Sequence, residues 1–359
     1  MTDFGKYLTD YLNRYLTMEC GCSYQTVKQY SVTFMLFIQY MYKIELIAPE
    51  KLCLKEFTKE RVLGFLHWLE DTRKCSISTR NNRLCALRSF FKFLQYREVK
   101  GMAYWQAILS IKQKKTPFKE MSYLTTEGVR VLLEQPDLST RKGRRDFVLM
   151  GLLYDSGARV QEIINLTPEN IRLGETTTVK LHGKGNKIRV VPLSTNQVKN
   201  LRLYMDENNL FAAQYRCHPL FPNPKGERLT RMAVLDIVKR HAENARKQYS
   251  ELIPNNISCH TFRHSKAMHM LEAGINLVYI RDFLGHTSTT TTEIYARASE
   301  KIKEQALKKL TSGIIQESKT TWQKDGDLME FLKALQEVFT CKKLLMTKKK
   351  LPVRFTGRG

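Results

Sequence analysis

The chain has 359 residues, 42% of them hydrophobic, which is enough length and apolar content for two domains with their own cores. The chain has 59 lysines and arginines against 35 acidic residues, which gives a formal charge of +24. This charge predicts a polyanionic partner such as nucleic acid, and a solvated basic surface without such a partner is the alternative. The composition excludes a disordered chain, and the lack of an apolar run near ~18 residues or of a signal-peptide core predicts a cytoplasmic protein without a membrane partner.

Residues 1 to about 110 are expected to form a helical domain. Apolar side chains recur at helical spacing between Ser23 and Met41, after a serine that can begin a helix. Thr58 is expected to cap a second helix. Ser78 is expected to begin a third helix, in which Leu84, Leu87, Phe91 and Leu94 form an apolar stripe.

The third helix and the segment after it are rich in cations. Residues 111–121, IKQKKTPFKEM, combine four lysines with a proline and are expected to be an exposed linker between domains. A solvated charged face is one interpretation, and contact with DNA phosphates, which position a protein without reading sequence, is the favoured one. The residues expected to contact DNA are Arg80, Arg83, Arg88, Lys92, Lys112, Lys114 and Lys115.

The second domain is expected to cover residues 122–312. Thr125 or Thr126 caps its first helix, and residues 147–154 form a buried apolar run. Residues 176–193 predict a β-hairpin, because two strand-like runs flank a turn that contains glycine. Gly274 is expected to end the helix that carries Arg263. Residues 313–359 predict one amphipathic helix, from Leu328 to Phe339, and a basic tail.

Arginines, histidines and a tyrosine recur in short motifs of this second domain. Arg159 and Arg263 could bind a phosphate under attack, since a guanidinium matches its oxygens and stays charged. Tyr295, nine residues after His286, could be a nucleophile if a base or nearby cations assist it. Proton transfer could fall to His260 and His286, and to Lys184 on the hairpin turn. For each residue alone, an ordinary ion pair, packing or surface role is the alternative.

A metal site is the competing interpretation of the histidines. His260 and His264 are spaced to share a helix face, and Cys259 is adjacent. However, the H-E-x-x-H glutamate is lacking, and no C-x-x-C pair occurs among the eight cysteines, which are expected to be reduced. The sequence therefore predicts neither a metal nor another cofactor, and it favours packing or surface roles for His264.

The second domain combines four motifs with a later tyrosine: A-R-V-Q-E from Ala158, G-K-G from Gly183, H-T-F-R from His260, L-G-H from Leu284, and Tyr295. This combination resembles the tyrosine recombinases, or phage integrase family. The resemblance covers roughly residues 1–312. It implies a mainly α fold with a small antiparallel sheet (α+β), in which an N-terminal helical, SAM-like core-binding domain and a catalytic domain form a C-shaped clamp on double-stranded DNA. Ala158 and Gln161 are small departures that leave the six functional residue types intact.

The resemblance also implies a mechanism. Tyr295 would form a 3′-phosphotyrosine, Arg159, Arg263 and His286 would stabilise the transition state, Lys184 would protonate the leaving oxygen, and His260 would assist the tyrosine. Strand exchange would pass through a Holliday junction in a homotetramer, with or without a second recombinase, and would need neither ATP nor a metal. No arm-binding domain is expected before residue 1, and this expectation favours a compact transposon or Xer-like recombinase of the bacterial nucleoid.

Three other functions are weighed against site-specific recombination. A type IB topoisomerase shares the phosphotyrosine chemistry but relaxes supercoils without exchanging strands. A DNA-binding regulator would keep the clamp without turnover, although the complete set of six residues argues against it. A metallohydrolase would use the histidines, and resistance of cleavage to EDTA would exclude it.

Overall fold

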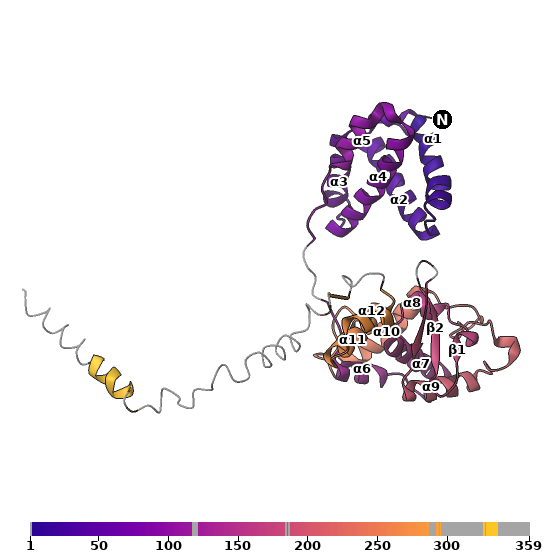
Figure 1. Cartoon of the computed structure of the whole chain (residues 1–359), viewed down its shortest axis with the longest axis vertical. Coiled ribbons are helices and arrows are strands. Elements are labelled where there is room, and N and C mark those ends of the chain that lie inside the picture. Colours follow the sequence, from indigo (N-terminus) through magenta and orange to yellow (C-terminus); the bar gives the residue numbers. More distant parts are fainter. Residues whose placement is uncertain are drawn as a thin grey trace, which may run out of the picture. The chain divides into compact units, whose positions relative to one another are not determined.

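The computed structural model describes residues 2–116, 121–183, 185, 187–286, 292–293, 295, 326 and 328–336. It divides into two compact units, residues 1–119 and 120–359, and the division falls within the segment expected to be a linker. Both are mainly helical, and the sheet lies in the second unit (Figure 1). Within the described residues, no helix is both long enough and apolar enough to cross a lipid bilayer.

Unit 1 is a bundle of helices around an aromatic core. Ser23 and Thr58 cap α2 and α3 as predicted, since each side chain accepts a hydrogen bond from a backbone N–H of the first turn. The third predicted helix begins earlier than expected, because Ser76, not Ser78, caps it. The elements are α1 (Asp3–Asp10), the π-helix η1 (Tyr11–Glu19), α2 (Tyr24–Lys43), the 3₁₀ turns η2 (Pro49–Lys51) and η3 (Leu54–Glu56), α3 (Lys59–Asp71), α4 (Ile77–Arg97), η4 (Val99–Gly101) and α5 (Met102–Leu109).

Unit 2 combines helices with a three-stranded antiparallel sheet, in the order β1-β2-β3. Figure 1 labels β1 and β2 of this sheet. Val179 and Leu181 of β2 and Val191 of β3 enter the core, which confirms the predicted hairpin. The elements are α6 (Thr126–Leu133), α7 (Arg141–Ser156), α8 (Val160–Ile164), η5 (Pro168–Asn170), β1 (Ile171–Arg172), β2 (Thr178–His182), β3 (Ile188–Pro192), α9 (Thr195–Glu207), η7 (Ala213–Tyr215), α10 (Arg231–Arg246), α11 (Cys259–Glu272) and α12 (Leu277–Leu284).

Two helix ends in unit 2 position the predicted functional residues. α7 ends at Gly157, whose φ of +56° turns the chain so that Arg159 becomes the N-cap of α8. α12 ends at Gly285 with φ +65°, and His286 follows directly. The predicted end of α11 is also confirmed, since the helix stops at Glu272 and Gly274 follows with φ +81°.

The tail expected to carry an amphipathic helix lies mostly outside the described residues. Residues 328–336 are helical, and the side chains of Leu328, Phe331 and Leu332 are exposed. The basic residues after position 336, and Val338 and Phe339 of the expected apolar stripe, lie outside the described part of the chain.

Candidate active site

The two predicted arginines meet where the ends of α7 and α12 come together. Arg263, on α11, is 3% exposed, and its guanidinium donates hydrogen bonds to the backbone oxygens of Gly157, at 2.7 Å, and Leu284, at 2.6 Å. The Arg159 side chain is 33% exposed and reaches the backbone oxygen of Gly285 at 3.5 Å. Arg263 therefore ties the two helix ends together, while Arg159 keeps part of its guanidinium open to a ligand.

A third arginine belongs to the same cluster and was not predicted. Arg189 of β3 donates to both carboxylate oxygens of Glu162, at 2.8 and 2.7 Å, and to the backbone oxygen of Phe283 at 3.0 Å. Glu162 also accepts from the Arg159 side chain at 3.1 Å and from its backbone N–H at 2.7 Å. Burial tends to raise the pKa of Glu162, but the hydrogen bonds and charges of the two arginines lower it below its usual value. Arg159, Arg189 and Arg263 are called the arginine cluster below.

The arginine cluster holds more positive charge than its own carboxylate balances. Burial, followed by the charges of Arg159 and Arg189, lowers the pKa of Arg263 to about 9. The group still carries its proton at neutral pH, but its neighbours repel it. An anion bound between the guanidiniums would relieve that repulsion, so the cluster is suited to a phosphate.

His286 and Tyr295 lie beside the arginine cluster. Their rings are nearly parallel, with centroids 6.3 Å apart, and Nδ1 of His286 is 2.9 Å from the hydroxyl of Thr292. Burial and the nearby arginines lower the pKa of His286 to about 4, so its ring is neutral at pH 7. Tyr295 is 3% exposed, and burial raises its pKa although Arg263 and Arg159 act in the opposite direction. Counting His260, five of the six predicted catalytic residues lie in one region of unit 2.

The histidine nearest the Tyr295 hydroxyl is not the expected one. His264 places Nδ1 3.1 Å from that oxygen. His260, one turn earlier on α11, is exposed, and its ring centroid lies 6.2 Å from that of His264. Partial burial and the charges of Arg263 and Arg159 lower the pKa of His260. The sequence assigned His264 a packing or surface role, and the i, i+4 spacing from His260 was the signal that could have placed it in the site.

Lys184, the sixth predicted catalytic residue, lies outside the described residues. Its neighbours Gly183 and Gly185 are described, and Gly185 has φ +73° in the turn between β2 and β3. Among the residues that are described, no three His, Cys, Asp or Glu side chains are grouped so that they could bind a metal ion.

The cations of unit 1 that are expected to contact DNA differ in how exposed they are and in whether they pair within the protein. Lys92 and Lys112 are exposed, and Arg88 is half-buried. Lys115 is exposed as well, whereas the exposed Lys114 pairs with Glu70 at 2.7 Å.

Two arginines of α4 are engaged within unit 1. Arg83 is half-buried and donates to the hydroxyl of Thr33 at 3.0 Å. Arg80 is only 4% exposed and donates to Asn81 at 3.1 Å and to the backbone oxygen of Lys112 at 3.5 Å. The expectation that Arg80 offers a phosphate contact is therefore not supported by its position, because its guanidinium anchors the segment after α5 instead.

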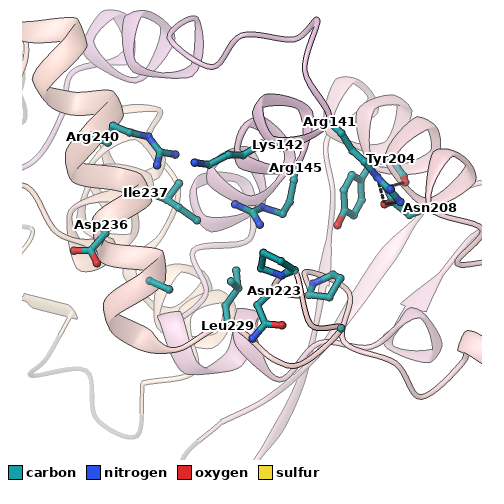
Figure 2. A pocket seen from close by; sticks show the side chains of 14 residues that line it. Arg141, Lys142, Arg145, Tyr204, Asn208, Asn223, Leu229, Asp236, Ile237 and Arg240 are labelled. Atoms are coloured by element: carbon teal, nitrogen blue, oxygen red, sulfur yellow. Dashed lines mark hydrogen bonds between the residues drawn. The ribbon is translucent and has the colours of Figure 1, made fainter.

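A concave region lies at the opposite end of α7 from Arg159. This cavity of about 820 Å³ is lined by the start of α7, by α10 and by the turn around Asn223 (Figure 2). Arg145 and Arg240 line it, and both donate to the buried carboxylate of Asp146, at 2.8 and 2.6 Å. Since α7 has 16 residues, its two ends are separated by ~24 Å. The cavity is distinct from the arginine cluster, and the cations on its wall are partly neutralised by Asp146.

Comparison with known proteins identifies the family. The model of the phage integrase family matches residues 122–301, and that of the phage integrase N-terminal SAM-like domain matches residues 8–101. The chain belongs to the phage integrase family of tyrosine recombinases. Tyrosine recombinase XerC of Roseiflexus castenholzii is 34% identical over 286 residues, which cover 79% of this chain and 86% of that protein. The chain is thus a DNA strand-breaking and rejoining enzyme.

Solved structures of tyrosine recombinases share the fold. The XerH site-specific recombinase bound to palindromic difH substrate, in a post-cleavage complex, matches with a TM-score of 0.65 and 23% identity, covering 80% of each chain. The Tn1549 transposon integrase bound to transposon right-end DNA matches with a TM-score of 0.64 and 15% identity, covering 87% of this chain and all of the other. The predicted fold class is confirmed.

Proposed function

We propose that this tyrosine recombinase cuts and rejoins duplex DNA at specific sites through Tyr295. The phenolic oxygen of Tyr295 forms a bond to the scissile phosphorus, and the bond from phosphorus to the 5′ oxygen breaks. The products are a 3′-phosphotyrosine and a free 5′-hydroxyl. The ester keeps the energy of the phosphodiester, so the 5′-hydroxyl of a second duplex can attack it and exchange strands through a Holliday junction.

The observation that carries this proposal is the position of Tyr295 beside the arginine cluster of its own chain. Arg263 and Arg159 are close enough to lower the pKa of the phenol, although burial prevails. Charge that develops on the non-bridging oxygens would be stabilised by Arg159 and Arg263, with His286 as a further hydrogen-bond donor. Removing one such donor typically slows catalysis by about 10²–10³-fold.

The remaining roles rest on the sequence motifs. Lys184, on the turn between β2 and β3, is proposed to protonate the leaving 5′ oxygen. His260 is exposed at the start of α11 and is proposed to assist proton transfer at Tyr295. The core-binding domain, residues 1–110, and the linker after it are proposed to bind the duplex backbone through Arg83, Arg88, Lys92, Lys112, Lys114 and Lys115.

The assembly and the biological role are proposed on the same basis. Strand exchange between two duplexes needs four active sites, so a homotetramer on two synapsed sites is proposed, with or without a second recombinase. Similarity in fold to a transposon integrase supports integration or excision of a mobile element, in the cytoplasm where the nucleoid lies. Residues 313–359 are proposed to contribute contacts between subunits.

A covalent-trapping experiment tests the nucleophile. The cognate site is first recovered by selecting duplexes that the wild-type protein captures covalently from a random-sequence pool, and it is then placed in a nicked suicide duplex. Wild type should form an adduct that survives denaturing electrophoresis. Tyr295→Phe should bind the duplex without an adduct, and the matched control Tyr279→Phe, at an exposed position of α12, should behave as wild type. An adduct with Tyr295→Phe would overturn the assignment.

The same site distinguishes recombination from relaxation. Two copies of the site on separate duplexes should yield recombinant products. Relaxation of a supercoiled plasmid without any recombinant product would instead support a type IB topoisomerase.

A further inference from the structure

The cavity at the start of α7 has no part in the proposed reaction, and positive side chains dominate its polar wall (Figure 2). It is called the cationic cavity below. Four cations line it: Arg141, Lys142, Arg145 and Arg240. Among the described residues, Asp236 is the only carboxylate in the lining, and Asp146 adds a second carboxylate behind the wall. The positive charges of these residues therefore outnumber the negative ones by two.

The buried carboxylate of Asp146 holds two of these cations in fixed positions. Its Oδ1 accepts hydrogen bonds from Nε and Nη2 of Arg145, at 3.1 and 2.8 Å, and its Oδ2 accepts one from Nη2 of Arg240 at 2.6 Å. A guanidinium has five N–H donors, so each arginine keeps donors that make no hydrogen bond with another described residue. Because Asp146 is 1% exposed and does not line the cavity, these remaining donors are available to a ligand inside it.

Arg141 and Lys142 add positive charge beside that pair. Arg141 donates from Nε and Nη2 to the side-chain oxygen of Asn208, at 3.2 and 2.9 Å, and this neutral amide positions the guanidinium without neutralising it. Lys142 is exposed and makes no ion pair with a described residue. Figure 2 shows its ammonium group and the guanidinium of Arg240 directed toward each other. Like charges arranged in this way repel, and an anion between them would relieve the repulsion.

The rest of the cavity wall is largely apolar and belongs to ordered structure. Leu229 and Ile237 are 7% and 5% exposed, and both are part of the core of unit 2. Pro222 precedes a turn in which the side-chain oxygen of Asn223 accepts a hydrogen bond from the backbone N–H of Glu227 at 2.9 Å. Such a wall can pack against the carbon atoms of a ligand, while the cations hold its charged end.

We propose that the cationic cavity binds a small organic phosphate, with the phosphate at the cations and the carbon skeleton against Leu229 and Ile237. Arginine and lysine are suited to phosphate, because a guanidinium matches two of its oxygens and an ammonium supplies a point charge. The cavity of about 820 Å³ is within the range of about 300–1,000 Å³ that is usual for small-molecule sites, so it fits a ligand the size of a nucleoside monophosphate. It lies ~24 Å from the other end of α7, and its occupancy does not depend on the role of Tyr295.

Titration calorimetry of the full-length protein at fixed ionic strength tests the class of ligand. The probe is adenosine 5′-monophosphate (AMP), and inorganic phosphate and adenosine represent its two parts. AMP should bind saturably and more tightly than inorganic phosphate, and adenosine alone should not bind. Equal affinities for AMP and inorganic phosphate would mean that the apolar wall takes no part. That result, or a lack of saturable binding of AMP, would overturn the proposal.

Two lysine variants test the place of binding. Lys142→Gln removes one cation at an exposed position without a partner in the described chain, and the affinity for AMP should fall by about tenfold or more. The matched control is Lys239→Gln, which removes the same charge from an exposed position next to Arg240 but outside the lining, and it should bind AMP as wild type does. Arg159→Gln should also keep this binding. A loss confined to Arg159→Gln would place AMP at the arginine cluster and overturn the proposal.

Hydrogen exchange and a DNA competitor complete the test. AMP should increase protection in peptides that cover residues 141–146 and 222–229, and it should leave α11 unchanged. A DNA duplex should not displace AMP from the wild-type protein. If the duplex displaces AMP, and Lys142→Gln weakens binding of the duplex while Lys239→Gln does not, the cavity belongs to a nucleic-acid surface and the proposal fails.

Discussion

Removing the carboxylate of Glu162 should lower the stability of unit 2 by more than the loss of a surface ion pair would. Glu162 is 4% exposed and balances Arg159 and Arg189, and in Glu162→Gln both guanidiniums would face Arg263 without compensation. Breaking a buried ion pair by removing one partner costs about 3–5 kcal/mol. Because a whole domain is stable by only about 5–15 kcal/mol, the loss should be large enough to expose unit 2 to unfolding at moderate urea concentrations.

The assay is urea unfolding of the full-length protein followed by circular dichroism, with hydrogen exchange to show which unit opens. Peptides from α8 and β3 should lose protection in Glu162→Gln, while those of α4 in unit 1 keep theirs. The matched control is Glu127→Gln, whose exposed carboxylate pairs with Arg130 three residues later and should contribute nothing measurable. If the two variants unfold at the same urea concentration, Glu162 does not hold the arginine cluster together.

Three further outcomes are expected. Gly285→Ala should lose about 1–2 kcal/mol of stability and form adduct more slowly, because the added Cβ would lie 3.0 Å from Cδ of Arg189 in β3. Gly274→Ala is the control for backbone strain in urea unfolding, because Gly274 has a similar φ and no neighbour within 4 Å. As pH falls from about 6.5 toward about 4, the unfolded chain binds more protons than the folded chain at His264 and His286. The melting temperature should therefore fall across this pH window and stay constant above it, as calorimetry at fixed salt can measure. Lys92→Gln should weaken binding to every duplex alike and reduce the slope of log affinity against log salt by about one in titrations.

Much of this fold could be predicted because local signals agree with the tertiary structure. Ser23, Thr58 and Thr125 each begin a helix, since a side-chain oxygen caps free backbone N–H groups whatever the rest of the chain does. The hairpin of β2 and β3 was also predictable, because strand-forming runs flank a glycine turn. Ser76 and Ser78 are equally good caps by type, and only packing decides that Ser76 begins α4.

The site was predictable in its motifs but not in its contacts. Arg189 lies on the same face of β3 as the buried Val191, so the alternation of the strand says only that it points inward, and its two bonds to Glu162 depend on where β3 meets α8. Arg80 appears in the sequence as one of several cations, yet its guanidinium is buried against the segment after α5. His264 required knowing which turn of α11 faces Tyr295. Each case depends on the packing of elements distant in sequence, which periodicity does not encode.

The arginine cluster also links folding of unit 2 to phosphate binding. Burial and the neighbouring guanidiniums lower the pKa of Arg263 to about 9, so its charge is less favourable in the folded state than in the unfolded state. An anion between the guanidiniums offsets this, and a ligand that binds only the folded state at 100 times its dissociation constant adds about 2.7 kcal/mol. Sulfate should therefore raise the melting temperature of wild type more than that of Arg159→Gln, measured against chloride at equal ionic strength. Equal shifts for both proteins would mean that sulfate acts generally on the surface, and that the cluster is not a phosphate site.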